Sequence, residues 1–289
     1  MRIISWNIQA AKGVDEVISV DRIAQVIKDL GDADIICCQE VMNCELSGVE
    51  TNQVQELSAH FPDYEVYFGS AIDRLQDCSQ HNGTRLQFGN LILSRVPVLH
   101  HSLHRLPQPA EAGIPCMPRQ AIEVVVPFHD KKGISRNCRV VTTHLDYFAA
   151  RQRTAQVRYL RHLNEQTLER FKCPGAQGGE MQFAALEETD LTVFCGDFNL
   201  SVDSEDYQIL TTSAEEPAES ILLDCWRLAN PNLPHAPTCG IFDRVQWSEG
   251  PHCRDFFFAS TALASHVDEM VVDTKTDASD HQPFMLTLT

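Results

Sequence analysis

The chain has 289 residues, 43% of them hydrophobic and 22% charged, which is ordinary for a globular protein. Its 40 acidic and 23 basic residues give a net charge of −17, which disfavours a protein that holds long duplex DNA through a broad basic face. No apolar run approaches the ~20 residues that a membrane-spanning helix needs, so no transmembrane segment is expected.

The chain shows no internal repeat, low-complexity tract or linker, so we expect residues 1–289 to form a single domain. The amino terminus, "MRIISWNIQ", has the pattern of a strand and lacks a basic region followed by a hydrophobic signal core, which favours a cytoplasmic protein. The eleven cysteines are odd in number and include no CxxC pair. They indicate neither a disulfide framework nor a zinc site, and we expect them to be buried.

Short segments rich in β-branched or aromatic residues and bounded by Gly, Pro, Asn or Asp predict strands along the chain. In chain order these are Arg2–Asn7, Ile35–Gln39, Tyr64–Phe68, Gly89–Ser94, Ala121–Val126, Arg139–Thr143, Thr192–Cys195, Phe256–Ala259 and Pro283–Leu288. Apolar residues at helical spacing predict helices over Val20–Leu30 and Arg151–Phe171. We expect loops at the proline-rich Arg105–Gln120, around Gly178 and at Asn230–Arg254.

Several of these strands end in a polar side chain. In "VFCGDFNLS", residues i and i+2 of a strand share a face, so Asp197 and Asn199 would point into one small volume beside the permissive Gly196. Taken alone, the stretch is equally typical of an Asx turn. The pattern recurs, however, and the polar residues at strand ends are Asn7, Glu40, His144, Asp146, Asp197, Asn199, Asp255, Asp280 and His281. Independent turns have no reason to select this set, so together these residues indicate a functional site.

The residue types suit metal-assisted hydrolysis of a phosphoester. Oxygen atoms of Asn7, Glu40 and Asp280 are ligands for Mg²⁺, with Mn²⁺ as a substitute. Histidine can donate a proton or hydrogen bond to a phosphoryl oxygen, and Asp197 can accept a proton from water. A bound divalent cation would invert the local charge, so the acidic composition does not exclude a phosphate substrate.

With these motifs in place, the chain resembles the endonuclease/exonuclease/phosphatase superfamily. The segments "SWN", "CQEV", "GNLILSR", "TTHLD", "GDFNLS" and "SDH" occur in the order of that family and extend from Trp6 to His281. The resemblance implies a four-layer α/β sandwich, in which two mixed β-sheets pack face to face with helices on the outside. It also implies a metal site at Asn7, Glu40 and Asp280, and a catalytic set made of His144, Asp197, Asn199, Asp255 and His281.

Two assignments stay open within that set. Either Asp197 or His281 can be the general base. The acid that orients His281 can be Asp255 or Asp243, since "FDRV" resembles the "FDRI" of tyrosyl-DNA phosphodiesterases; we prefer Asp255 because it directly precedes an apolar strand. Arg119, at the end of the proline-rich loop, can reach a substrate phosphate or form a surface salt bridge.

We therefore expect a Mg²⁺-dependent phosphoesterase that hydrolyses a phosphodiester or phosphomonoester by in-line attack of an activated water. The acidic charge slightly favours a small-molecule phosphoester over nucleic acid. The alternative is a DNA endonuclease or a DNA end-processing phosphodiesterase, although His144 departs from the tyrosine that apurinic endonucleases tend to have there. A non-catalytic binding member of the same fold is a third possibility, and the complete set of polar residues argues against it.

Overall fold

The computed structural model describes residues 1–289 except 47–48, 76–84, 177, 179, 181–185 and 213–219. Its strands are β1 (Arg2–Asn7), β2 (Ile35–Leu46), β3 (Val49–Asn52), β4 (Glu65–Leu75), β5 (Arg85–Ser94), β6 (His100–Arg105), β7 (Gln120–His129), β8 (Ser135–His144), β9 (Thr192–Asp197), β10 (Leu222–Asp224), β11 (Asp255–Ser260), β12 (Val267–Val272) and β13 (Phe284–Leu288). Its helices are α1 (Val20–Leu30), α2 (Gln53–His60), α3 (Ala150–Lys172), α4 (Glu205–Thr211) and α5 (Cys225–Ala229), with short 3-10 turns η1 (Gln9–Ala11) and η4 (Ala264–His266).

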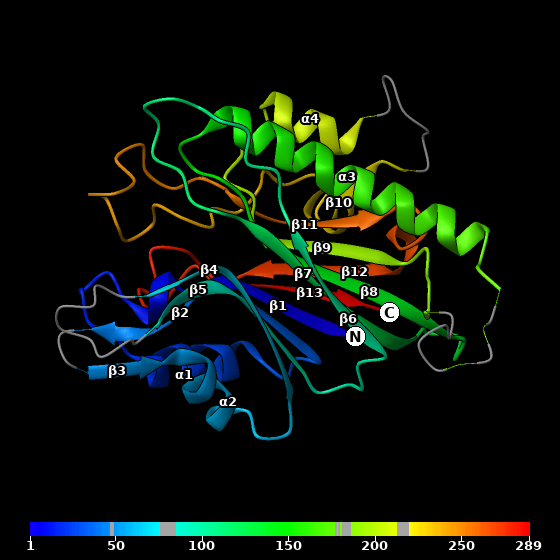
Figure 1. The fold of residues 1–289 in the computed structure, drawn as a ribbon, viewed down its shortest axis with the longest axis horizontal. Coiled ribbons are helices and arrows are strands. Elements are labelled where there is room, and N and C mark those ends of the chain that lie inside the picture. The colour runs from blue at the N-terminus through cyan, green and yellow to red at the C-terminus, as the bar shows by residue number, and fades with distance from the viewer. Residues whose placement is uncertain (47–48, 76–84, 177, 179, 181–185, 213–219) are drawn as a thin grey trace.

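The strands form two mixed sheets. The seven-stranded sheet has the order β12-β13-β1-β2-β5-β4, with β3 also paired to β2, and the six-stranded sheet has the order β10-β11-β9-β8-β7-β6. Each sheet has one parallel pair at its centre, β1 with β2 and β8 with β9. In Figure 1, α1 and α2 lie on the outer side of the first sheet, and α3 and α4 lie on the outer side of the second.

Alternation along the strands divides the apolar side chains among three cores. Successive strand residues point to opposite faces, so Ile3 packs between the two sheets while Ile4 packs beneath α1. In the second sheet, Val140 faces the inter-sheet core and Val141 faces the core beneath α3. Three apolar layers thus hold four layers of secondary structure together, and the predicted four-layer α/β sandwich is confirmed.

Helix α1 has the predicted bounds because its sequence carries both end signals. The Ser19 side chain caps the first turn by accepting the Arg22 N–H, and Gly31, with φ 125°, ends the helix. Helix α3 is one residue longer at each end than predicted. No helix among the described residues is long and apolar enough to cross a membrane.

All nine predicted strands are present, and most of them are longer than predicted. The sequence reading missed β3, β6, β10 and β12, which are short. Residues 106–119 and 230–254 are loops as expected, whereas part of the stretch around Gly178 (177, 179 and 181–185) lies outside the described residues. The expectation of buried cysteines is wrong for Cys116 and Cys173, which are exposed.

Candidate active site

Three candidate residues lie in one row across adjacent strands of the second sheet. The strand register pairs His144 with Asp197 and Asp197 with Asp255. Strands β8 and β9 are parallel and end together, and the antiparallel strand β11 begins at the same edge. The sheet therefore delivers an imidazole and two carboxylates to one rim.

Asn199 reaches this rim through a turn. Strand β9 ends at Asp197, Asn199 has φ 51°, and its backbone N–H donates to Asp197 Oδ1 at 2.9 Å. Gly196 has φ 130°, and a Cβ there would lie 2.0 Å from the Thr143 carbonyl oxygen, so only glycine fits. The expectation that Asp197 and Asn199 share a strand face is wrong, because an Asx turn brings the two side chains together.

Glu40 comes from the first sheet. The pairing of β2 with β5 shifts between Cys38 and Val41, and Glu40 itself has φ 57°. This left-handed conformation is uncommon for a residue other than glycine, and here it turns the carboxylate out of the strand alternation and into the cleft. Backbone strain of this kind concentrates at functional sites.

Asn7, at the end of β1, connects the two sheets. Its amide nitrogen donates to Glu40 Oε1 and to Asp197 Oδ2, both at 3.1 Å. Its amide oxygen accepts the Gln9 N–H at 3.1 Å. In this arrangement Asn7 joins two carboxylates as a donor, and its role as a direct metal ligand stays a prediction.

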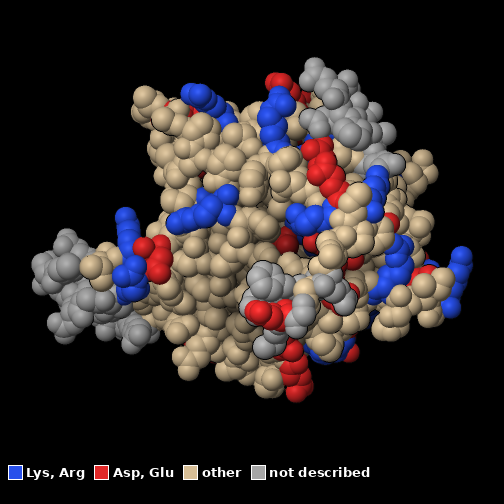
Figure 2. Space-filling model, turned by 45° about the vertical axis from the view of Figure 1, so that its right-hand side comes forward, with Lys and Arg blue, Asp and Glu red and all other residues tan. Residues whose placement is uncertain are grey.

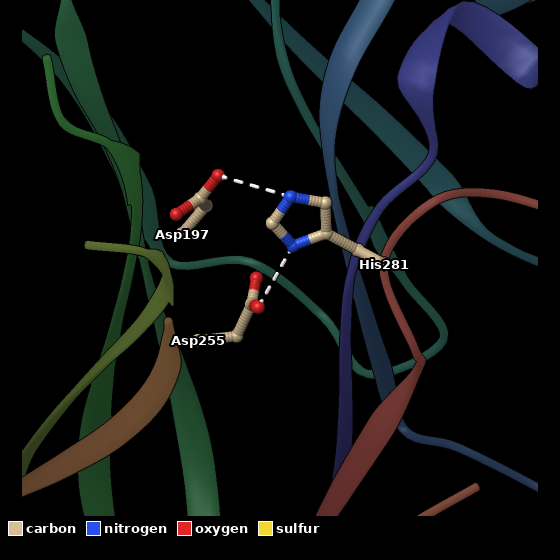
Figure 3. A group of neighbouring side chains, drawn as sticks. All are labelled: Asp197, Asp255 and His281. Atoms are coloured by element: carbon tan, nitrogen blue, oxygen red, sulfur yellow. Dashed lines mark hydrogen bonds and ion pairs between the residues drawn. The ribbon is translucent and has the colours of Figure 1, made fainter. Parts of the chain in front are cut away.

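His281 lies between two carboxylates (Figure 3). Its Nδ1 is 2.8 Å from Asp255 Oδ2, and its Nε2 is 3.7 Å from Asp197 Oδ2. The indole N–H of Trp6 donates to the His281 carbonyl oxygen at 2.9 Å and so fixes the backbone. Burial lowers the pKa of His281, but the neighbouring carboxylates, chiefly Asp255, raise it well above its usual range. The neighbouring carboxylates therefore favour the protonated ring.

At the rim, the buried carboxylates outnumber the cationic side chains that could balance their negative charge. Burial raises the pKa of Asp197 to about 7, although His281 opposes the shift. Burial also raises the pKa of Glu40, and the charge of Asp280 adds to this effect. A cluster in this state favours any ligand that brings positive charge.

His144 lies between an amide and two carboxylates. The Asn199 amide nitrogen donates to the Leu145 carbonyl oxygen at 3.1 Å and lies 3.1 Å from His144 Nε2. Nε2 is also 3.3 Å from Asp197 Oδ2, and Nδ1 is 3.8 Å from Glu40 Oε1. Burial, together with the charge of Arg119, lowers the pKa of His144 well below its usual range, which favours a neutral ring.

Arg119 is buried at the same cleft. Its side chain is only 5% exposed, and its Nε lies 3.9 Å from Asp146 Oδ2. That Nε has no hydrogen-bond partner in the part of the chain that the structure describes. Arg119 therefore does form an ion pair, but the pair is buried and not on the surface, and the guanidinium also lines the cleft.

Asp280 accepts hydrogen bonds from two side chains that the sequence did not predict to lie near it. Its Oδ2 accepts the Gln246 side-chain N–H at 2.9 Å and the Trp247 indole N–H at 3.1 Å. Both donors lie in the long loop before β11, at a distance along the chain that no local pattern connects to Asp280.

The two candidates for the orienting acid differ in their partners. Asp255 makes the hydrogen bond to His281, whereas Asp243 accepts the backbone N–H groups of Val245 and Gln246, both at 2.9 Å. Asp243 therefore closes the turn that carries Gln246.

An open cleft of about 600 Å³ is lined by the polar residues Glu40, Arg119, His144, Asp197, Asn199, Asp280 and His281. Its lining also includes the apolar side chains of Pro115, Met117, Tyr147, Phe148 and Trp247. Trp247 is 2% exposed and also lines the cleft, whereas Phe242, in the same loop, is 41% exposed. Tyr147 and Phe148 were not identified from the sequence.

Comparison with known proteins gives the family. The sequence profile of the Endonuclease/Exonuclease/phosphatase family matches residues 4–281. The chain therefore belongs to this family, whose members are hydrolases. No curated protein matches the chain by sequence.

Solved structures agree in fold. A mannosyl-6-phosphatase from Bacteroides thetaiotaomicron is 17% identical with a TM-score of 0.65, over 100% of this chain and 99% of that one. The human Nocturnin catalytic domain with bound sulfate is 19% identical with a TM-score of 0.62, over 100% and 94%. The Xenopus laevis APE2 catalytic domain is 17% identical with a TM-score of 0.62, over 100% and 91%. At these identities the likeness shows the fold alone.

Proposed function

We propose that this chain is a divalent-metal-dependent phosphoesterase that hydrolyses a phosphodiester or phosphomonoester by in-line attack of water. One observation carries the proposal. Segments from both sheets bring Glu40, Asp197 and His281 into one cleft. Asn7 donates hydrogen bonds to both Glu40 and Asp197, and Asp255 holds His281. This is the arrangement that positions a water, a phosphoryl group and stabilising donors together.

The chain's own groups divide the chemistry between them. Both ring nitrogens of His281 face carboxylate oxygens, so the ring is a donor, and Asp197 is the group that accepts the proton of the attacking water. The imidazole of His144 and the guanidinium of Arg119, which line the cleft, donate to phosphoryl oxygens. Because these donors are fixed before the substrate binds, they stabilise the charge of the transition state without reorganisation.

The donor set fits a hard divalent cation. The Glu40 carboxylate accepts a hydrogen bond from Asn7, and Asp280 faces the same cleft, so oxygen ligands predominate, as Mg²⁺ and Mn²⁺ prefer. Glu40 and Asp280 would hold the ion, with Asn7 beside them. A bound cation would polarise a non-bridging oxygen or stabilise the leaving oxygen.

The charge distribution favours a small phosphoester over nucleic acid. Acidic and basic side chains are interspersed on the face shown in Figure 2, which has no continuous basic track. A net charge of −17 also repels a polyanion at long range. A DNA endonuclease or DNA end-processing phosphodiesterase is the second candidate, because the family includes nucleases.

A phosphoester panel tests the proposal. Wild type and His281→Ala are assayed on bis-p-nitrophenyl phosphate, sugar phosphates, nucleotides, lipid phosphodiesters and plasmid, in Mg²⁺, in Mn²⁺ and with chelator. We expect hydrolysis that chelator abolishes and that the substitution lowers by about 10³-fold or more. Rapid nicking of plasmid, with little action on the small substrates, would favour the second candidate. A protein inert on the whole panel would instead be a non-catalytic binding member.

A further inference from the structure

Four aromatic rings extend in series from the candidate catalytic histidine to the mouth of the cleft. The rings of His281 and Trp247 are 5.6 Å apart at 84°, and those of Trp247 and Tyr147 are 5.7 Å apart at 87°. The rings of Tyr147 and Phe148 are 4.7 Å apart at 83°. All four residues line the same cleft, and we call them the aromatic ladder.

Exposure increases along the aromatic ladder. Trp247 is 2% exposed, Tyr147 is 37% exposed and Phe148 is 62% exposed. Perpendicular ring contacts of this kind are favourable and fix the relative orientation of the rings. The Arg254 guanidinium lies over both Trp247 and Tyr147, at 5.6 and 5.8 Å from their ring centres, which fixes these two rings further. Phe148 is thus an exposed apolar ring on a rigid support.

The position of the aromatic ladder defines what it can contact. It begins at His281, where the phosphoryl group would react, and Pro115 and Met117 line the same cleft. A group attached to the phosphate can therefore lie along these rings. Leaving a ring such as Phe148 in water forgoes the free energy of its burial, and a flat apolar group would recover it.

We propose that the aromatic ladder selects phosphoesters that carry a planar ring, of the size and shape of a nucleobase or aryl group, with Phe148 as a specificity-determining residue. The inference rests on the proposed function, because it places the phosphate beside His281. It adds the class of substrate: a small phosphoester with a ring, in preference to a sugar or alkyl phosphate. A cleft of about 600 Å³ has room for such a molecule.

A matched pair of substrates isolates the ring. Adenosine 5′-monophosphate and ribose 5-phosphate carry the same phosphate on the same primary 5′-oxygen of a ribose, and they differ in the base, which ribose 5-phosphate lacks. We expect kcat/KM to be about tenfold higher for adenosine 5′-monophosphate, since stacking of one base contributes about that much. Phe148→Ala should bring the ratio close to one, and Phe148→Trp should keep it.

Phe171→Ala is the matched control. Phe171 is 40% exposed on α3 and lies about 30 Å along that helix from its start beside Phe148, so its removal should leave the ratio unchanged. A ratio near one in wild type, or a ratio that Phe148→Ala leaves intact, would overturn the inference.

A binding measurement can test this inference independently of the proposed function. Titration calorimetry with the same two phosphates in Mg²⁺, in an Asp197→Asn background that the proposed function expects to be inactive, measures the preference without turnover. A preference for adenosine 5′-monophosphate that Phe148→Ala removes, in a protein that hydrolyses no phosphoester, would support the aromatic ladder and reject the phosphoesterase. Equal affinity for the two phosphates would reject the aromatic ladder, whatever the activity.

Discussion

Two regions of the molecule bury ionisable side chains, and they do so in opposite ways. In the first, which we call the Glu123 cluster, Glu123 on β7 accepts from Arg139 Nε on β8 at 2.7 Å and lies 3.1 Å from His104 Nε2 on β6. Burial raises the pKa of Glu123, but His104 and Arg139 lower it to about 2, so the carboxylate is firmly ionised and paired.

At the active-site rim, the negative charges of the buried carboxylates are not balanced by nearby cationic side chains. Asp197, Asp255, Asp280 and Glu40 gather around one imidazolium and the more distant Arg119, and the pKa of Asp197 rises to about 7. A buried charge with a matched partner serves the fold, whereas an excess of one sign marks a place prepared for a ligand. The comparison predicts that substitutions at the rim affect activity, and that substitutions in the Glu123 cluster affect stability.

The largest expected effect is on catalysis at the rim. Asp255→Asn should lower kcat by about 10²- to 10⁴-fold, because the imidazolium of His281 loses the charge that orients it. Steady-state kinetics on the best substrate of the panel measures the effect. Asp243→Asn is the control and should stay within about threefold of wild type. If Asp243→Asn were the more damaging substitution, the orienting acid would be misassigned.

The Glu123 cluster should show the reverse behaviour. Glu123→Gln leaves the buried Arg139 without its counter-charge, so the free energy of unfolding should fall by about 3 kcal/mol while kcat changes little. Urea denaturation followed by circular dichroism gives the value. A large loss of kcat in a variant that remains fully folded would contradict the division between the two regions.

At the rim, Asp197→Asn removes one of several like charges. Its free energy of unfolding should therefore stay within about 1 kcal/mol of wild type, even though activity is lost. If the free energy of unfolding fell as much as in Glu123→Gln, the carboxylate charges at the rim would be balanced by cationic partners.

Acid titration sharpens the same contrast. The pKa of Glu123 is lower in the folded state than its ordinary value, so its contribution is complete above about pH 4.3 and is lost as the pH falls towards 2. The difference in unfolding free energy between wild type and Glu123→Gln should shrink over that interval. A difference that stays constant from pH 6 to about pH 2.5 would show that Glu123 is not ionised by its partners.

The smallest effect concerns the support of Asp280. Gln246→Met removes one of the two donors to Asp280 Oδ2, so kcat/KM should fall about fivefold. Gln25→Met is the control, since Gln25 also donates to an aspartate, Asp29, but on the surface of α1. Equal activity in the two variants would show that Trp247 alone is enough to position Asp280.

Much of the fold follows from local sequence signals. Runs such as Ile3–Ile4 and Val140–Val141 are apolar at every position, which is typical of strands covered on both faces, and Ser19 and Gly31 bracket α1. The missed strand β6 reads "HHSLHR" and lies at a sheet edge, where only alternate side chains are half-buried, so its pattern carries little apolar signal.

The sequence predicts that the polar residues of the site gather at one rim, but it does not predict their geometry there. Asn7, Glu40, Asp197 and His281 stand out because each polar residue follows or precedes an apolar strand. The left-handed backbone conformation of Glu40 depends on strand register. The hydrogen bond from Gln246 to Asp280 depends on how a long loop packs across the molecule. Such long-range contacts leave no periodic trace in the sequence.

We expect a divalent cation to bind at the rim and to neutralise the excess negative charge of its buried carboxylates. Mn²⁺ binding, measured by the electron paramagnetic resonance signal of the free ion, tests it most directly in wild type, Glu40→Gln and Glu123→Gln. We expect wild type and Glu123→Gln to bind Mn²⁺ saturably, and we expect the affinity of Glu40→Gln for Mn²⁺ to be at least about tenfold weaker. Wild type that binds no Mn²⁺, or Glu40→Gln that binds it as tightly as wild type, would contradict the account.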